Sequence, residues 1–165
     1  MAGTPRLTLP FLGVGQAQKE FTHNESLQTL DVLVSGAIEG QPLATPPTAP
    51  EVGSAYLVAG AATGAWAGRD DCVAAWTSGG WRFISPVEGV TLYERTSGTS
   101  ATFRSGAWDI GTLFASSLRI DGLQVVGPQA AAIASPAGGS IVDVEARAAL
   151  GALLATLREH GLIAS

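Results

Sequence analysis

The residue types that most often bind metals are few in this sequence. His23 and His160 are the only histidines, and neither has a second ligand at the spacing that a metal site needs. Asp70 and Asp71 are adjacent carboxylates, but the other ligands of a calcium-binding loop do not accompany them. We therefore predict no metal site and no cofactor.

Acid–base and nucleophilic chemistry have equally little support. Glu88 and Glu94 are the kind of carboxylate pair that hydrolyses glycosides, but no pattern marks a cleft around them. Cys72 is the single cysteine and fits a small core residue better than a reactive thiol. The Gly-Val-Gly at 13–15 lacks the preceding strand and third glycine of a nucleotide fingerprint. We predict no catalytic residue and a protein that is not an enzyme.

Composition narrows the classes of partner. The 165 residues have a net charge of −5, and the nine basic side chains are scattered, so nucleic acid binding is not expected. The longest helical apolar stretch, 148–157, is about half of a membrane span, so membrane insertion is not expected either. Only 14% of residues are charged, which favours a surface covered by other subunits. A monomer with a tight β-core is the alternative.

The order of patterns along the chain predicts an α+β fold. The β body is expected to be a small antiparallel meander or sandwich of about six to eight short strands. The predicted segments are an extended docking arm at 1–20, a helix at 21–40, a Pro-rich connector at 41–53, the β body at 54–127, and a loop with a C-terminal helix at 128–165.

The first helix is predicted from a start signal and an apolar period. Thr22 and Glu25 have the spacing of a capping box, in which each side chain bonds the backbone of the other residue. Gly40 and Pro42 would end the helix. One apolar stripe is predicted for this helix, made of Leu27, Leu30, Val34 and Ile38.

A short motif occurs twice in the β body, at 75–83 and 102–110. In each copy an aromatic residue, a Ser-Gly pair and a tryptophan predict a tight hairpin with aromatic side chains on both arms. The tryptophans have two interpretations. They form the core, or the faces of Trp66, Trp81 and Trp108 form a ligand platform for sugar rings.

The C-terminal helix is apolar on several sides. Ser140 or Asp143 would cap it, and Gly161 would end it. One face carries Ala146, Leu150, Leu153, Leu154 and Leu157, and further alanines cover much of the rest. Such a helix is usually buried on several sides, by its own sheet or by symmetry mates.

The chain also resembles an uncharacterised family encoded in prophages and gene transfer agents of alphaproteobacteria. The most specific part is N-terminal: Leu9-Pro10-Phe11, Gln16-Ala17-Gln18-Lys19, Thr22-His23-Asn24-Glu25, Leu27 and Leu30-Asp31. Further matches include Gly64-Ala65-Trp66, Ala75-Trp76, Glu88-Gly89, Ala132-Ile133-Ala134-Ser135-Pro136 and His160-Gly161-Leu162-Ile163. The sequence departs from the family at Val90, where members often carry tryptophan.

Members of this family lie beside phage head and tail genes, so the resemblance implies a non-enzymatic virion protein. We expect a head spike base or fibre connector, present in the virion, assembled in the bacterial cytoplasm and forming a cyclic homo-oligomer. The residues expected to dock on capsid, spike fibre or tail proteins are Leu9, Phe11, Gln16, Gln18, Lys19 and Phe21. The alternative is an adhesin module that binds polysaccharide of the host capsule or cell surface.

Overall fold

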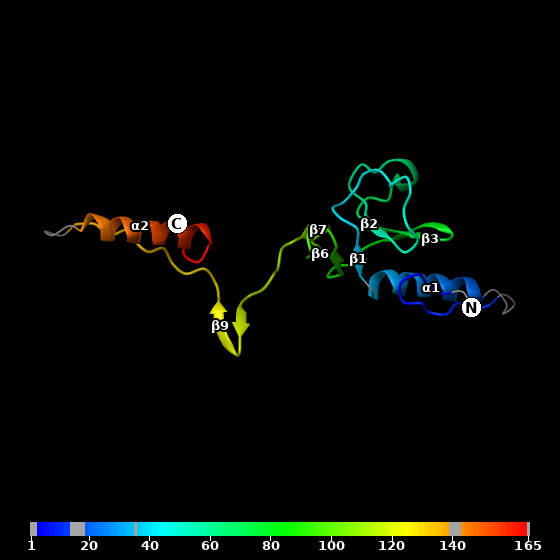
Figure 1. The fold of residues 1–165 in the computed structure, drawn as a ribbon, viewed down its shortest axis with the longest axis horizontal. Helices are drawn as coiled ribbons and strands as arrows, with labels where there is room; N and C mark the ends of the chain where they lie inside the picture. Colours follow the sequence, from blue (N-terminus) through cyan, green and yellow to red (C-terminus); the bar gives the residue numbers. More distant parts are fainter. Residues whose placement is uncertain (1–2, 14–18, 35, 139–142, 165) are drawn as a thin grey trace. The chain divides into compact units, whose positions relative to one another are not determined.

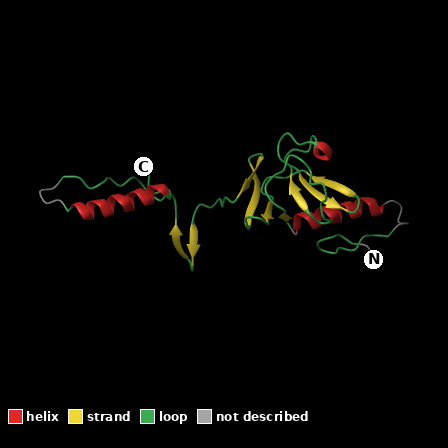
Figure 2. Cartoon of the chain, turned by 45° about the horizontal axis from the view of Figure 1, so that its top comes forward, coloured by secondary structure: helices red, strands yellow, loops and turns green. Residues whose placement is uncertain are grey.

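The computed structural model describes residues 3–13, 19–34, 36–138 and 143–164. The chain divides into two compact units, Met1–Leu113 and Phe114–Ser165, which are described separately. The fold is α+β, as predicted, with two helices and several short antiparallel strands (Figures 1 and 2).

The first unit contains one helix and two small sheets. Helix α1 spans Lys19–Val34, and a short 3-10 helix, η1, spans Gly64–Trp66. One sheet has the strand order β1-β5-β6-β7 and the other β2-β3-β4. The strands are β1 (Ala37–Ile38), β2 (Ala55–Leu57), β3 (Val73–Thr77), β4 (Gly80–Ile84), β5 (Thr91–Glu94), β6 (Thr99–Arg104) and β7 (Ala107–Ile110).

Two hydrophobic clusters hold this unit together, on opposite faces of the β2-β3-β4 sheet. Successive residues of a strand point to opposite faces, so Val73 and Ala75 enter one cluster while Ala74 enters the other. The first cluster also includes Val32 of α1 and Leu92 of β5, and it thereby joins the helix to both sheets.

The repeated motif forms the two hairpins that the sequence predicts. Trp76 pairs directly with Trp81, and Phe103 pairs directly with Trp108. The turns differ in detail, however. Ser105 and Gly106 both have positive φ, at 52° and 81°. In the first hairpin the positive φ lies on Gly80 instead, at 98°.

The start and end of α1 correct two sequence predictions. The helix begins at Lys19, so Thr22 lies inside it and its carbonyl accepts the Ser26 hydroxyl at 2.8 Å. The Glu25 carboxylate pairs with Arg82 at 3.2 Å, and the predicted capping box is therefore wrong. The helix ends at Val34, and Ala37–Ile38 forms β1, which pairs in parallel with β5.

The predicted apolar stripe of α1 is also wrong, because the helix ends before Ile38 and buries other residues. The residues of α1 that lie buried are Asp31 and Val32, whereas Leu30 and Val34 are exposed. Ile38 is fully buried, but it belongs to strand β1, which pairs with β5, and not to the helix. Asp31 can be buried because its carboxylate accepts hydrogen bonds from the N-terminal segment.

The second unit consists of a two-stranded ribbon and a helix. Strands β8 (Leu118–Ile120) and β9 (Leu123–Val126) pair around a turn at Asp121-Gly122, so part of the predicted 54–127 body belongs to this unit. Helix α2 spans Val144–Glu159, and Asp143 caps it by accepting the Ala146 N–H at 2.8 Å. In the part of the chain that is described, neither helix has the length and apolar character needed to cross a bilayer.

Candidate functional site

The N-terminal segment folds back on itself instead of extending as an arm. Gly3 and Pro10 form an antiparallel bridge, and the Thr4 N–H donates to the Leu9 carbonyl at 3.0 Å. Further along, the Leu12 N–H donates to the Asn24 side chain on α1, also at 3.0 Å. Described residues of the predicted 1–20 arm therefore pack against their own unit.

Asp31 is the anchor of this segment. Its carboxylate is 1% exposed and accepts the Thr4 hydroxyl at 2.7 Å and the Arg6 N–H at 3.0 Å. It also accepts the Leu7 N–H. Several donors aimed at one buried carboxylate compensate for the cost of removing its charge from water.

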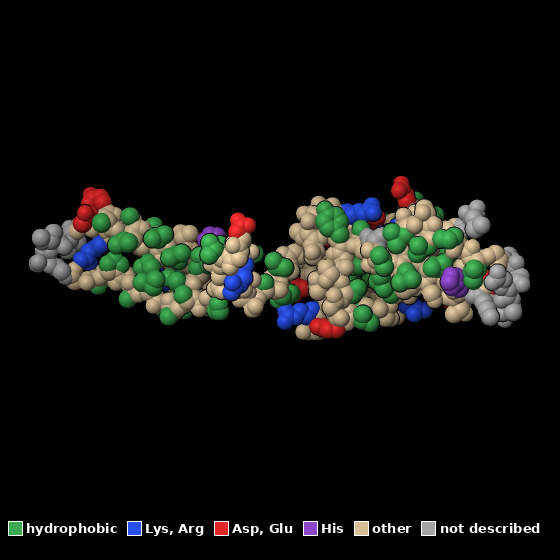
Figure 3. Space-filling view, turned by 90° about the horizontal axis from the view of Figure 1, so that it is seen from below, with side chains coloured by type: hydrophobic (Ala, Val, Ile, Leu, Met, Phe, Trp, Pro, Cys, Tyr) green, Lys and Arg blue, Asp and Glu red, His purple; other side chains and the backbone are tan. Residues whose placement is uncertain are grey.

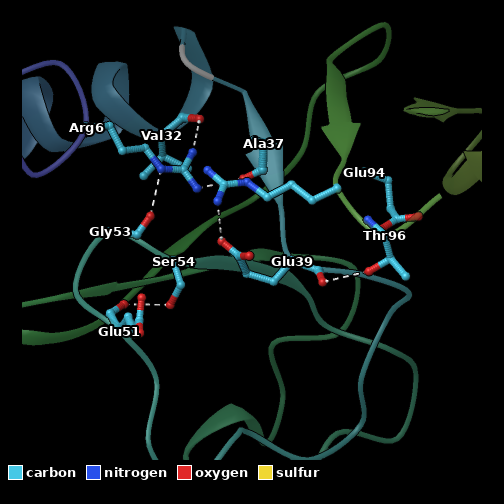
Figure 4. Close-up of polar contacts among 10 residues, drawn as sticks. Arg6, Val32, Ala37, Glu39, Glu51, Gly53, Ser54, Glu94 and Thr96 are labelled. Atoms are coloured by element: carbon cyan, nitrogen blue, oxygen red, sulfur yellow. Dashed lines mark hydrogen bonds and ion pairs between the residues drawn. The ribbon is translucent and has the colours of Figure 1, made fainter. Parts of the chain in front are cut away.

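Arg6 extends the anchor to two more segments (Figure 4). Its guanidinium donates to the carbonyls of Gly53 and Ala37, both at 2.7 Å, and to Val32 at 3.4 Å. Burial and the nearby Arg95 lower its pKa, while Asp31 and Glu39 act in the opposite direction. An arginine remains protonated in proteins, so its charge is a fixed part of this structure.

Glu94 is a second buried carboxylate, and it holds a turn. It is fully buried at the end of β5 and accepts the N–H groups of Thr96 at 2.6 Å and Ser97 at 2.9 Å, together with the Ser97 hydroxyl. Glu88, by contrast, is exposed and accepts the Ser105 N–H at 2.9 Å in the next hairpin. The pair that resembled glycosidase carboxylates thus stabilises two backbone turns.

Stability is expected to fall in acid partly through Glu94. The hydrogen bond from the Ser97 hydroxyl holds the pKa of Glu94 below its ordinary value of 4.5, despite the opposing effect of burial. The unfolded chain therefore binds the proton more readily, and the stabilisation is present above about pH 4.5 and is lost as pH falls through the lower folded value. Urea unfolding at a series of pH values should show a shallower acid loss for Glu94→Gln. An unchanged acid slope in Glu94→Gln, with Glu88→Gln as the exposed control, would contradict this role.

The predicted docking residues are only partly brought together. Leu9 and Phe11 are half-buried in the N-terminal segment, Phe21 is 70% exposed, and Lys19 is the first residue of α1. Gln16 and Gln18 lie outside the described residues. Leu30 and Val34, which the sequence placed in one apolar stripe, add to the exposed apolar surface. Figure 3 shows hydrophobic side chains gathered on one face of this unit.

Trp66, Trp76 and Trp81 pack together in one aromatic cluster and do not form an open platform. The Trp81 ring lies 5.0 Å from Trp66 and 4.9 Å from Trp76, both edge to face, and 5.9 Å from Tyr56. Trp66 is completely buried, so its prediction as part of a ligand platform is wrong. Its position on η1, facing the β2-β3-β4 sheet, closes the second hydrophobic cluster.

Trp108 is also committed to its own unit. Its indole N–H donates to the Asp71 carbonyl at 2.8 Å, and its ring lies 5.4 Å from Phe103. The side chain is half-buried and packs against the first hydrophobic cluster. Of the three predicted platform residues, only Trp81 borders a described cavity.

That cavity is a groove of about 330 Å³ between α1 and the outer strand β4. Trp81 and Phe83 supply apolar walls, and the Arg69 guanidinium lies 5.1 Å from the centre of the Phe83 ring. From α1, Gln28 contributes a buried amide oxygen for which no hydrogen-bond partner is described. Aromatic faces with nearby hydrogen-bonding groups suit a polar ligand such as a sugar. No pattern in the sequence linked α1 to β4, so this groove was not predicted.

These features define an α+β module whose polar clusters hold backbone turns. Among the described residues, no three histidine, cysteine, aspartate or glutamate side chains are grouped to hold a metal ion. Residues 23–109, more than half of the chain, match the family described as a protein of unknown function (DUF2793), and the chain belongs to that family. The match begins in α1 and ends in β7, within the first unit. No curated protein matches the chain.

Proposed function

We propose that this chain is a non-enzymatic structural component of a phage-like particle, either a gene transfer agent or a prophage virion. In this role it is the base of a head spike or a connector for a fibre. The resemblance described above, which is most specific at 9–31, supports the setting. The observation that carries a structural role is the large apolar surface that the chain leaves uncovered.

That surface is concentrated in the second unit. Among the large apolar side chains described there, only Leu154 and Ile163 are buried. Eleven are exposed: Phe114, Leu118, Ile120, Leu123, Val125, Val126, Ile133, Val144, Leu150, Leu153 and Leu162. Soluble monomers rarely leave large apolar areas exposed, whereas subunits of assemblies cover them with their neighbours.

The first unit supplies a second surface for docking on another virion protein. Val34 is 70% exposed on α1, and Leu30, four positions earlier on the same face, is also exposed. Phe21 is equally exposed, but it lies nine positions before Leu30 and therefore on the opposite side of the helix. The anchor at Asp31 and Arg6 fixes the N-terminal segment and the helix to each other, so the surface is preorganised and costs little entropy to bind. We propose that the face of α1 formed by Leu30 and Val34 contacts capsid, spike fibre or tail protein.

Purified particles test this function. A tagged chain produced in the cell that makes the particles should sediment with them. Val34→Asp should reduce its occupancy by about tenfold, because a charge in an apolar contact is costly. Thr22→Asp adds the same charge to an exposed position of the same helix, about 120° around the helix axis from Val34, and should bind normally. A chain that stays in the soluble fraction and never accompanies particles would overturn the proposal.

The groove between α1 and β4 favours a second candidate, a carbohydrate-binding adhesin. Trp81, Phe83 and the buried amide of Gln28 are the groups that would contact a sugar. An array of bacterial surface polysaccharides decides this case, with Gln28→Leu as the variant that removes the unpaired oxygen. Binding that is absent, or that Gln28→Leu leaves intact, excludes the groove as a sugar site.

A further inference from the structure

We propose that helix α2 binds α2 of further copies of this chain, through a seam made of Ala146, Leu150, Leu153 and Leu157. The inference rests on the proposed structural role, which it deepens by naming the partner that covers the second unit. The partner surface is the same apolar seam on another copy of the chain.

The spacing of the four seam residues is that of a coiled coil. They lie four, three and four positions apart, which is the a/d repeat that keeps one line of apolar side chains facing a partner helix. Leu150 is 49% exposed and Leu153 is 55% exposed, so the centre of the seam is open in the single chain.

The chain covers a different side of α2. The segment 130–138 runs beside the helix (Figures 1 and 2), where Arg158 donates to the Ile133 carbonyl at 2.6 Å and Arg147 donates to Gly138. Ala130 is paired with the residues just after the helix, through its N–H to Leu162 at 2.9 Å. Buried Leu154 marks this covered side. The intrachain packing therefore leaves the seam free.

The charges of α2 permit two seams to meet. No charged residue occurs from Ala148 to Leu157. The arginines that flank this stretch, Arg147 and Arg158, are directed to the carbonyls of the 130–138 segment. A partner that pairs with the seam therefore needs no compensating charge and only a matching line of apolar side chains, which α2 itself provides.

The size of the exposed surface favours an identical copy over a transient foreign partner. The second unit has a two-stranded ribbon and a 16-residue helix, and two of its described large apolar side chains, Leu154 and Ile163, are buried. This core is too small for the unit to stay folded alone. Their cover must be present whenever the unit is folded, and copies of the same chain meet that condition. The surface that further copies would cover is the eleven exposed apolar side chains of the second unit, with Leu150 and Leu153 in the seam, and a stable interface buries about 800 Å² per partner.

Sedimentation of the full chain over a range of concentrations tests the seam. The wild type should form one discrete oligomer. Leu153→Glu should weaken its association by about 100-fold, since each interface then buries unpaired charges. Ala148→Glu places the same charge on an exposed position of the other side of α2 and should leave association unchanged. Equal dissociation by both variants would overturn the seam assignment.

A variant that enlarges the seam separates loss of association from loss of folding, because stronger association cannot result from a misfolded chain. Ala146→Leu adds apolar volume at an exposed seam position and should tighten association by about tenfold. A strict monomer at every concentration, or an oligomer that Ala146→Leu does not strengthen, would overturn the inference. The two proposals fail separately. A monomer that still accompanies particles overturns only the seam, and an oligomer absent from particles overturns only the virion role.

Discussion

Asp31→Ala is expected to lower the free energy of unfolding by about 3 kcal/mol. The substitution leaves the Thr4 hydroxyl and the N–H groups of Arg6 and Leu7 without their buried acceptor. The guanidinium of Arg6 also loses a carboxylate whose charge favours its protonated form. Chemical denaturation followed by fluorescence measures the change, because the tryptophans all lie in the same unit.

Asp70→Ala is the matched control for Asp31. The Asp70 carboxylate also accepts two backbone N–H groups, from Ala61 and Ala62, but it is exposed. Water can replace it there, so the expected loss is about 1 kcal/mol or less. Equal losses in the two variants would show that burial gives Asp31 no special role, and the anchor would have to be abandoned.

Trp66→Ala is expected to cost about 3–5 kcal/mol of stability, because it empties the centre of the second hydrophobic cluster. Trp66 is fully buried and contacts the rings of Tyr56 and Trp81. Its indole N–H is buried without a described partner, so Trp66→Phe removes an unsatisfied donor and should cost much less than Trp66→Ala.

Tyr93→Ala serves as the control for aromatic truncation. Tyr93 lies on β5 with its side chain exposed, so the expected loss is below about 1 kcal/mol. Denaturant midpoints of the three variants give the comparison. A Trp66→Ala loss as small as that of Tyr93→Ala would contradict the assignment of Trp66 to the core and return it to the ligand platform.

The hairpins could be predicted because their signals are local. A Ser-Gly turn with an aromatic residue on each arm fixes which residues pair, and Trp76–Trp81 and Phe103–Trp108 follow from it. Strand β1 could not be predicted in the same way. Its two residues pair in parallel with β5, far away in sequence, and a helical period that ran on to Ile38 concealed it.

The polar contacts that organise the first unit were hidden for a related reason. The capping box of Thr22 and Glu25 satisfied a local rule, but the helix starts earlier and Glu25 pairs with Arg82 on a distant strand. No pattern in the sequence indicates that Asp31 is buried. It is buried only because the folded N-terminal segment presents its donors there. Both cases depend on tertiary contacts that a single sequence does not reveal.

The positions of the exposed apolar residues change the roles that we assign to the two helices. On α1 the predicted apolar stripe is exposed at Leu30 and Val34, so we place the proposed docking surface on the helix instead of on an extended arm. On α2 the expected burial on several sides is met on only one side within the chain. We therefore interpret the first unit as a stable scaffold and the second as a surface for assembly.

Hydrogen exchange of α2 at two protein concentrations tests the central claim, that this chain is completed by other copies of itself. We expect the amides from Ala148 to Leu157 to be protected at high concentration and to exchange rapidly on dilution. The buried strands β2, β3 and β5 should keep their protection at both concentrations. Equal protection of α2 at both, in a chain that sediments as a monomer, would contradict the claim.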